Sequence, residues 1–164
     1  MRTIIHDLNS SEFNELSKCP EDYIINANEC KHNCIGCFSC WIKHPKECAI
    51  KDDYSNMVEF ISKSSELIII SKCRYGCYDN NVKRVLERCI GYVLPYFTIR
   101  NNEIHHASRY NESLKLKVYL YGDLSYEDKE CVEKLARANA INLNSSKYEV
   151  NYFNNLKELM KCIH

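Results

Sequence analysis

Short apolar runs recur along the chain with helix-like patterns between them, and this alternation restricts the possible folds more than any other feature of the sequence. The purest run is Leu67-Ile68-Ile69-Ile70, which contains no polar residue and is typical of a strand that is buried on both faces. Strands that alternate with helices predict a parallel sheet covered by helices on both sides, which is an α/β fold. The five expected strands span residues 2–8, 22–27, 66–71, 114–121 and 147–153.

Apolar residues at helical spacing predict the helices that connect these strands. Ser125, followed three residues later by Asp128, resembles the capping box with which many helices begin. The helix after the first strand is expected to be short, because it has to end before Pro20. The longer helices are expected at residues 54–63, 80–92, 125–143 and 154–163. Strands connected in this way favour the order 2-1-3-4-5, which leaves a ligand crevice at the carboxyl ends of the strands.

Two long stretches, roughly 28–53 and 94–112, show neither the pattern of a strand nor that of a helix and are expected to be irregular loops. The first contains a group of closely spaced cysteines, and the second contains Pro95 and Asn101-Asn102. Long loops inside compact domains are usually functional. The length of 164 residues suits one domain, so we expect a single domain at 1–164 with a cysteine-rich insertion loop at about 28–53.

The charge balance argues against partners that are recognised through a net electric field. The sequence has 22 Lys plus Arg and 22 Asp plus Glu, so no net charge draws it to nucleic acid or to an anionic membrane. Its 12 tyrosines are scattered, and no basic patch accompanies them as a single-stranded nucleic acid would need. No apolar run approaches membrane-spanning length, and the first residues turn polar too soon for a signal peptide. We therefore expect a cytoplasmic protein with no nucleic acid and no membrane among its partners.

The closely spaced cysteines follow the pattern Cys34-x2-Cys37-x2-Cys40-x7-Cys48. The tight spacings allow three thiolates to converge on a compact group, and the fourth can close the set from beyond, so we expect these residues to bind a metal centre. Gly36 allows a sharp turn between the first two ligands. An iron–sulfur cluster is favoured, because structural zinc more often uses two separated pairs of cysteines. Zinc and unmetallated thiols remain the alternatives.

The other cysteines and the histidine pair have simpler interpretations. Cys30 could replace one of the four ligands, whereas the remaining cysteines are expected to pack as small apolar residues. Adjacent residues of an extended segment point in opposite directions, so only one of His105 and His106 could face a site, and surface positions are favoured for both. Asp53 precedes a helical pattern and is expected to cap that helix. The cysteines expected to pack are Cys19, Cys73, Cys77, Cys89, Cys131 and Cys162.

The cysteine pattern and the segments that follow it resemble the NADPH-dependent FMN reductase-like and iron–sulfur flavoprotein family of the flavodoxin superfamily. Residues 34–41, Cys-Ile-Gly-Cys-Phe-Ser-Cys-Trp, are similar to the cysteine loop of that family, and residues 48–53 are similar to the segment that closes the loop. The similarity continues in the same order through 65–71, 74–76, 82–88, His105-His106 and Arg109-Tyr110. It covers residues 30–112 strongly, whereas residues 114–153 agree only as a strand–helix–strand pattern.

The resemblance implies a flavodoxin-like three-layer sandwich with FMN at the strand ends and a 4Fe-4S cluster on the four closely spaced cysteines. In such proteins the cofactors supply the redox chemistry and the protein positions them. Tyr75 could stack on the flavin, Gly76 allows close approach, and Lys72 or Arg74 could stabilise an anionic ring. The opposite interpretation is that Tyr75 packs and both cations point to water. The expected FMN contacts are Ser10, Ser11, Ser71, Lys72, Arg74, Tyr75, Gly76 and His106.

The loop after the first strand departs from the family pattern. Family members generally have a Gly-Ser-Pro-Arg-type loop here, whose amides and hydroxyls hold the FMN phosphate at a helix N-terminus. This chain has His-Asp-Leu-Asn-Ser-Ser-Glu at residues 6–12. Ser10 and Ser11 could still donate to a phosphate, but Asp7 and Glu12 would bring negative charge close to it. Lys72 also stands where the family usually has proline.

We therefore expect a redox flavoprotein or electron carrier that resembles these FMN reductases and iron–sulfur flavoproteins and acts as an oxidoreductase. Its partners would be an electron donor, either a reduced carrier or NAD(P)H, an acceptor that the sequence does not identify, and further copies of the chain in a homo-oligomer. The cysteine loop leaves the second strand and is expected to lie over the crevice, near the flavin. The alternatives are a non-catalytic flavodoxin-like module that has lost FMN and keeps a structural zinc or cluster site, and a plain flavin reductase with unmetallated cysteines.

Overall fold

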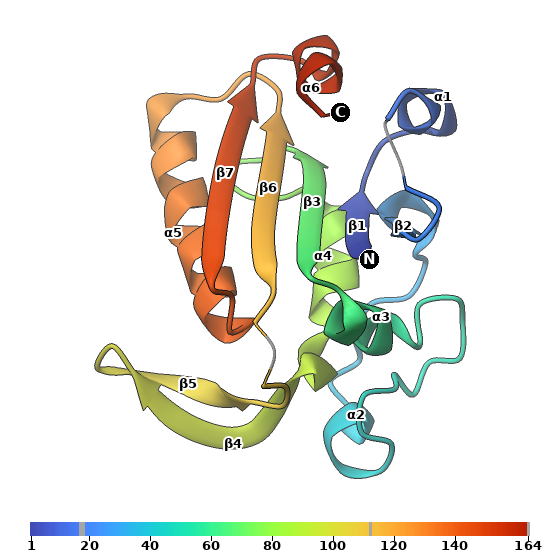
Figure 1. Cartoon of the computed structure of the whole chain (residues 1–164), viewed down its shortest axis with the longest axis vertical. Coiled ribbons are helices and arrows are strands. Elements are labelled where there is room, and N and C mark those ends of the chain that lie inside the picture. Colours follow the sequence, from blue (N-terminus) through green and yellow to red (C-terminus); the bar gives the residue numbers. More distant parts are fainter. Residues whose placement is uncertain (17–18, 112, 164) are drawn as a thin grey trace.

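Helices cover both faces of a parallel sheet in the computed structural model, which describes residues 1–16, 19–111 and 113–163 (Figure 1). The strands of this sheet are β1 (Arg2–His6), β2 (Tyr23–Asn26), β3 (Glu66–Lys72), β6 (Lys115–Tyr121) and β7 (Lys147–Phe153). All neighbouring pairs are parallel, and the order is β2-β1-β3-β6-β7. The expected order 2-1-3-4-5 is therefore confirmed, and the fold is flavodoxin-like.

The central strand β3 explains why both faces of the sheet need helices. The helices are α1 (Ser10–Asn14), α2 (Ser39–Ile42), α3 (Met57–Lys63), α4 (Asn80–Glu87), α5 (Tyr126–Asn142) and α6 (Leu156–Cys162), with 3-10 turns η1 (Ala27–Glu29) and η2 (Ile90–Tyr92). Leu67 and Ile69 of β3 belong to a core formed with α3, α4 and α5. Ile68 and Ile70, which point to the other face, belong to a second core with α1 and α6. Each face of the buried strand thus has its own apolar layer.

The expectation that residues 94–112 form an irregular loop is wrong for most of the segment. β4 (Val93–Arg100) and β5 (Glu103–Ser108) pair as a separate antiparallel sheet. Asn101 and Asn102 connect them with φ values of 51° and 63°, which are typical of a two-residue type I′ turn. Pro95 lies where the register shifts, between Val93 and Phe97, so its missing N–H interrupts no regular ladder. Residue 112 lies outside the described residues.

The helices are present where the sequence predicts them, but several boundaries differ. The helix expected at 80–92 is divided into α4, which ends at Glu87, and η2. The helix expected from residue 54 begins at Met57, because a turn closed by Ser55 N and Asp52 O at 3.0 Å precedes it. Its N-cap is Asn56, so Asp53 is not the cap that we expected. The capping box at Ser125 is confirmed.

The cysteine-rich segment lies at the amino-terminal ends of the strands, so the expectation that it covers the crevice at the carboxyl ends is wrong. The chain between β2 and β3 has to return to the amino-terminal side before a parallel strand can begin. On this return it passes along α4, where Arg84 Nη1 donates to Cys30 O at 2.7 Å and Nε donates to Asn33 Oδ1 at 2.6 Å. In Figure 1 the strand arrowheads point up, whereas α2 and the β4–β5 hairpin lie at the bottom.

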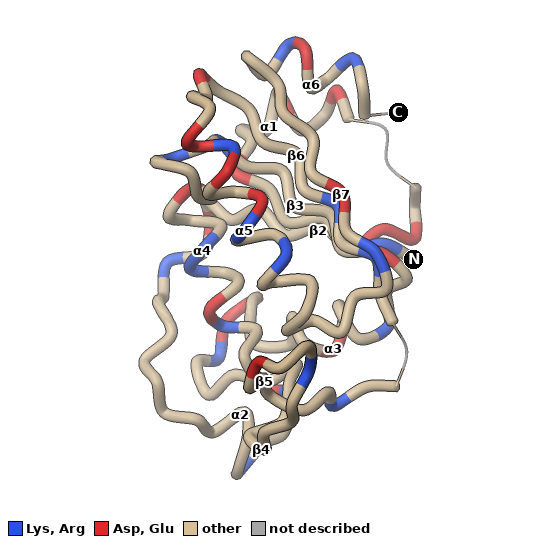
Figure 2. The backbone as a smooth tube through the Cα atoms, turned by 90° about the vertical axis from the view of Figure 1, so that its left-hand side faces the viewer, with Lys and Arg blue, Asp and Glu red and all other residues tan. Residues whose placement is uncertain are grey.

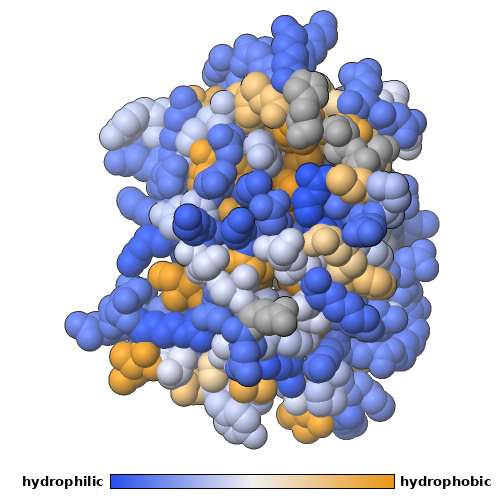
Figure 3. Space-filling view, viewed as in Figure 1, coloured by the Kyte–Doolittle hydropathy of each residue, from blue (hydrophilic) through white to orange (hydrophobic). Residues whose placement is uncertain are grey.

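The surface near α2, β4 and β5 is less charged and more apolar than the rest. Figure 2 shows acidic and basic residues interspersed along α4 and α5, whereas the end with α2 and β4 is mostly uncharged. Figure 3 shows hydrophobic side chains at that lower end of the molecule. The exposed large apolar residues there are Ile35, Phe38, Ile42, Tyr96, Phe97, Ile99 and Ile104. Within the described ranges, no helix combines the length and the apolar character needed to cross a membrane.

Candidate functional site

A cavity of about 570 Å³ lies at the amino-terminal end of the sheet, between the cysteine-rich segment, the ends of α4 and α5, and the start of β4. We call it the cysteine cavity, because its lining includes all the predicted metal ligands, Cys34, Cys37, Cys40 and Cys48. Its inner wall includes the buried core residues Ile61, Leu67 and Ile69. The structure therefore brings the predicted ligands to one partly apolar space.

Two residues with a left-handed backbone conformation determine the path of the chain around Cys37. Gly36 has a φ of 64°, as expected for a sharp turn between the first two cysteines. Phe38, the N-cap of α2, has a φ of 53°, a conformation that is uncommon for a residue other than glycine. Together they turn the backbone on both sides of Cys37, so that this thiol and Cys40 face the same cavity.

Contacts with the η2 turn fix α2 in place. Trp41 Nε1 donates a hydrogen bond to Ile90 O at 3.0 Å, and the Trp41 ring packs against Phe38 with centroids 5.1 Å apart. Cys40 lies directly on Gly91, where an added β-carbon would be 3.2 Å from Cys40 Cβ. A β-carbon at position 91 would therefore require Cys40 to shift by a few tenths of an ångström.

The predicted ligands differ in exposure and surround a space without meeting at one point. Cys34 and Cys37 are exposed, Cys48 is half-buried and Cys40 is buried. Burial raises the pKa of Cys40, and the charges of the neighbouring thiolates, Cys48 foremost, raise it further. Among residues 1–16, 19–111 and 113–163, no three Cys, His, Asp or Glu side chains are close enough to hold a single metal ion.

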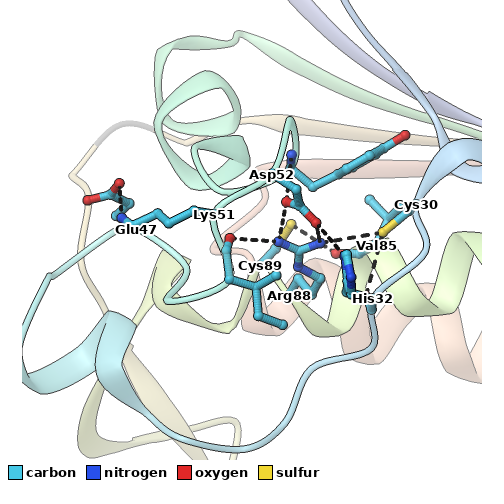
Figure 4. Close-up of polar contacts among 10 residues, drawn as sticks. Cys30, His32, Glu47, Lys51, Asp52, Val85, Arg88 and Cys89 are labelled. Atoms are coloured by element: carbon cyan, nitrogen blue, oxygen red, sulfur yellow. Dashed lines mark hydrogen bonds and ion pairs between the residues drawn. The ribbon is translucent and has the colours of Figure 1, made fainter.

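Arg88 places a buried positive charge beside the cysteine cavity (Figure 4). Its guanidinium makes a two-armed ion pair with Asp52, with Nη2–Oδ1 at 2.6 Å and Nη1–Oδ2 at 2.8 Å, and Nη1 lies 3.6 Å from Cys30 Sγ. Burial lowers the pKa of Arg88, but Asp52 and the thiols of Cys48 and Cys30 raise it more, so the side chain stays charged. Its Nε is buried and has no hydrogen-bond partner in the described part of the chain.

Asp52 is the counterion that makes this burial possible. Hydrogen bonds from Arg88 lower the pKa of Asp52 to about 2 against the opposing effect of burial, and His32 and the Tyr54 amide, each at 3.0 Å, contribute. Cys89, which also lines the cavity, donates to Val85 O at 3.3 Å, and burial raises its pKa to about 12. Cys89 is therefore a neutral packing thiol, as predicted.

Thiolates are ligands of both structural zinc and iron–sulfur clusters, so the donor set of the cysteine cavity suits either group. A structural zinc ion requires its sulfur ligands at about 2.3 Å, whereas a 4Fe-4S cluster holds its thiolates apart around a larger body. The unpartnered Arg88 Nε is the kind of donor that stabilises negatively charged sulfur.

Most predicted FMN contacts lie at the opposite end of the sheet, after β3. Ser71 is buried, and its hydroxyl donates to Asp7 Oδ2 at 3.2 Å and accepts from Asp79 N at 2.8 Å. Arg74 Nε pairs with Asp79 Oδ2 at 3.2 Å. The Lys72 side chain is exposed, and Tyr75 is 99% exposed, so the ring of Tyr75 is available for stacking.

Gly76 is explained by packing within the protein. Its φ is 67°, and a β-carbon there would lie 2.6 Å from the Cβ of Cys131 on α5. Two backbone bonds between Arg74 and Cys77, at 2.8 and 3.1 Å, close the turn that presents Tyr75. The close approach at Gly76 in this structure is made by α5, and the flavin contact there stays a prediction.

The turn between β1 and α1 uses its own side chains to satisfy its donors. Asn9 N donates to the Glu12 carboxylate at 2.8 Å, and Glu12 N donates to Asn9 Oδ1 at 3.0 Å. The Ser11 hydroxyl also donates to Asn9 Oδ1, at 2.6 Å. Ser10 is exposed at the first position of α1, a helix of only 5 residues.

Asp7 joins the carboxyl ends of β1, β3 and β6. Its Oδ2 accepts a bond from Lys72 N at 2.7 Å, and its Oδ1 accepts one from the Tyr121 hydroxyl at 3.1 Å. Burial raises the pKa of Asp7, although these bonds lower it in part. The exposed ring of Tyr75 and the carboxylates of Asp7 and Glu12 therefore lie in the region where the FMN contacts were predicted, and Asp7 and Glu12 already accept hydrogen bonds from several of its donors.

His106 does not lie with the other predicted FMN contacts. It is on β5, lines the cysteine cavity, and packs on Trp41 and Phe97 with centroids 5.0 and 4.9 Å away. His105 is not the surface residue that we expected, since its side chain is 12% exposed and contacts Asn142 and Glu103. The antiparallel hairpin, which the sequence analysis missed, places both rings against the body of the protein.

The remaining cysteines follow the packing prediction only in part. Cys89 is buried and Cys73 and Cys77 are half-buried, but the prediction is wrong for the exposed Cys19, Cys131 and Cys162. Cys131 is on α5 and is exposed, although its Cβ lies close to Gly76. Cys30 is buried against Arg88 and lies outside the cavity lining, so it stands apart from the four predicted ligands.

The sequence analysis missed Arg88, the ion pair of Asp52 and the position of Asp7. A signal for Arg88 was available, because it follows Val85 by three residues, a spacing that places the two residues on the same side of a helix. A charged residue on that side needs a buried partner. The identity of the partner depends on the turn before α3, which no local pattern specifies.

Comparisons with known proteins agree with the fold. No protein-family model matches the sequence, and no curated protein matches it. Among solved structures, an FMN-dependent NADH-azoreductase from Bacillus anthracis strain Ames Ancestor, in complex with FMN, is similar with a TM-score of 0.52. The similarity covers 99% of this chain and 97% of that chain at 11% sequence identity. At this identity the likeness shows the flavodoxin-like fold and does not extend to activity.

Proposed function

We propose that the protein is a flavin-dependent oxidoreductase or electron carrier that binds a 4Fe-4S cluster in the cysteine cavity. The observation that carries this proposal is that Cys34, Cys37, Cys40 and Cys48 line one cavity beside the buried cation Arg88. A bound cluster supplies one-electron redox chemistry. The residues of this chain hold the sulfur ligands in place, exclude water from the inner wall and compensate negative charge.

The inner and outer sides of the cysteine cavity would have different roles in holding the cluster and in exchanging electrons. Cys40 is buried against Gly91, and core side chains lie behind it, so the inner side is dry. Cys34 and Cys37 are exposed and form the outer side, where an electron donor or acceptor can approach. Arg88 lies at the Cys48 side and favours the more negative, reduced state of a cluster.

A flavin at the carboxyl ends of the strands is the second part of the proposal. Two observations support it: the solved neighbour is an FMN complex, and Tyr75 exposes its ring fully in the loop after β3. We propose that the flavin ring stacks on Tyr75 near Lys72. By analogy with that NADH-dependent neighbour, the electron donor is a nicotinamide nucleotide, with a reduced carrier protein as the alternative.

The two proposed centres would be separated by the length of the sheet. β3 has 7 residues and therefore spans about 23 Å at ~3.3 Å per residue. Electron transfer over such a length within one chain would be slow, so we propose a homo-oligomer in which the cysteine cavity of one subunit faces the strand ends of another. The exposed apolar side chains on α2 and the β4–β5 hairpin would lie at that contact.

Purification without oxygen, followed by iron and sulfide analysis, tests the cluster. We expect about four iron and four acid-labile sulfide per chain, with broad visible absorption. Cys37→Ser and Cys40→Ser should lose most of this iron, because each removes one thiolate ligand. The matched controls Cys131→Ser and Cys162→Ser change exposed thiols outside the cavity and should keep it.

Two results would reject the cluster. One is a colourless wild-type protein with a single zinc ion per chain, which would support a non-catalytic zinc module. The other is iron that stays bound at wild-type levels in both cavity variants. Loss of iron in the control variants to the same extent would show that the cysteine cavity has no special part in binding.

A further inference from the structure

The turn between β1 and α1 presents carboxylates where a phosphate-binding turn presents donors. We infer that the strand-end site selects against phosphorylated flavins and takes an unphosphorylated flavin such as riboflavin, with Asp7 and Glu12 as the residues that determine this specificity. The inference rests on the proposed flavin at the strand ends and specifies its chemical class. The proposed cluster does not depend on it.

Three donors near the helix N-terminus after β1, two backbone amides and one hydroxyl, are already bonded within the turn. In phosphate sites of this architecture, backbone amides and hydroxyls of the first turn point at the anion. Here the amides of Asn9 and Glu12 each donate to the side chain of the other residue, and the Ser11 hydroxyl donates to Asn9 Oδ1. The Glu12 carboxylate thus already occupies the anion position of this turn.

Asp7 removes the donors on the adjacent side of the same crevice. Its carboxylate accepts bonds from Lys72 N at 2.7 Å, from the Ser71 hydroxyl at 3.2 Å and from the Tyr121 hydroxyl at 3.1 Å. These three donors come from the ends of β3 and β6, the strands that flank the crevice. A ligand phosphate would have to displace a carboxylate that is satisfied on both oxygens.

The negative charges of Asp7 and Glu12 also disfavour a phosphate, in addition to their use of hydrogen-bond donors. A flavin phosphate is close to a dianion at neutral pH, since its second pKa is about 6. Asp7 and Glu12 would repel it, and Arg74, in the loop after β3, already pairs with Asp79. Lys72 is exposed and contributes little attraction through water.

The ring and the ribityl chain of a flavin are uncharged, so Asp7 and Glu12 do not repel them. The Tyr75 ring is 99% exposed and needs no displacement before a flat aromatic ring can stack on it. Riboflavin carries the same ring as FMN and ends in a neutral ribityl chain. Its hydroxyls can donate to carboxylates such as Glu12, which a phosphate dianion cannot do.

Parallel titrations with riboflavin and FMN test the inference on the intact, cluster-loaded protein. Binding is followed by the quenching of flavin fluorescence. We expect riboflavin to bind at least tenfold more tightly than FMN. The double variant D7N/E12Q should gain at least tenfold in FMN affinity and keep its riboflavin affinity within about twofold.

Two further variants separate charge selectivity from general effects. Glu15→Gln removes one exposed carboxylate from the end of the same helix and should leave the selectivity unchanged. Tyr75→Ala removes the stacking surface and should weaken both flavins by a similar factor. Circular dichroism of each variant shows whether it has folded, and the wild-type comparison requires no variant.

Each contrary outcome has a distinct meaning. FMN binding as tight as riboflavin binding, or an unchanged preference in D7N/E12Q, overturns the inference and leaves a flavin at the strand ends. If neither flavin binds while iron is present, the inference and the flavin part of the proposed function both fail, and the cluster remains.

Discussion

A partly buried aspartate lies at each end of the sheet, and the two carboxylates have opposite electrostatic surroundings. Asp52, beside the cysteine cavity, faces the cation Arg88 and has its pKa lowered to about 2. Asp7, at the strand ends, accepts hydrogen bonds only from neutral groups, and burial raises its pKa. The cavity end therefore balances the Asp52 carboxylate with a cation, whereas the strand end satisfies the Asp7 carboxylate with neutral hydrogen-bond donors.

Asp52→Asn should have the largest effect on stability, because it leaves the buried Arg88 guanidinium without its counterion. Loss of one partner of such a pair costs about 3 kcal/mol. The midpoint of urea unfolding should fall accordingly. Asp53→Asn, a change at the exposed neighbouring residue, should alter the free energy of unfolding by less than about 0.5 kcal/mol. Equal losses in the two variants would show that the ion pair contributes nothing.

The same pair predicts how the cavity end responds to acid. The folded-state pKa of Asp52 is about 2, below the usual 3.8, so its stabilisation is present above pH 4 and is lost as the pH falls toward 2. Between pH 4 and pH 2 the wild-type protein should therefore lose more stability than Asp52→Asn. Parallel unfolding-versus-pH curves for the two proteins over this range would contradict the account.

A substitution at each of two glycines with the same backbone conformation compares how tightly the protein is packed at the strand ends and in the cysteine-rich segment. Gly76 and Gly36 have φ values of 67° and 64°, so alanine at either position is strained by about 1 kcal/mol. Only Gly76 also faces a close neighbour, since its added β-carbon would lie 2.6 Å from Cys131 Cβ. We expect Gly76→Ala to cost about 2 kcal/mol or more and Gly36→Ala about 1 kcal/mol in thermal unfolding. A larger loss for Gly36→Ala would mean that the cysteine loop is packed more tightly than the structure shows.

Asp7→Asn should have the smallest effect and the opposite sign. The folded-state pKa of Asp7 is above its unfolded value, so the ionised carboxylate weakens the fold at neutral pH and the protonated form does not. We expect the stability of the variant relative to the wild type to rise between pH 4 and pH 7, with no such trend below pH 4. Asp123→Asn, at an exposed position, should show no such trend. A fall in this relative stability between pH 4 and pH 7 would indicate that the charge of Asp7 supports the strand ends.

The sheet could be predicted from the sequence because its signals are local. The apolar run at 67–70 and the capping box at Ser125 each determine an element without help from distant residues. The β4–β5 hairpin was missed because Pro95 and Asn101-Asn102 resemble loop residues. In the structure they form the register shift and the turn of the hairpin. The residues that form the turn of a hairpin are the same types that occur in irregular loops. The sequence therefore does not distinguish the two until the pairing of the strands is known.

The spacing of the cysteines predicted which thiols lie around one space, whereas the surroundings of that space could not be predicted. The spacing from Cys34 to Cys48 was sufficient to expect four thiols around one centre, and the structure places them on one cavity. The end of the sheet at which they lie depends on the path of the chain between β2 and β3. Arg88 and Asp52 are 36 residues apart, so their pairing is a property of the tertiary structure.

X-ray absorption at the iron edge of the anaerobically purified protein tests the central claim most directly. A cluster held by the four cavity cysteines predicts sulfur ligation of every iron together with short iron–iron contacts. Iron coordinated mainly by nitrogen and oxygen, or zinc with four sulfur ligands and no iron, would contradict it.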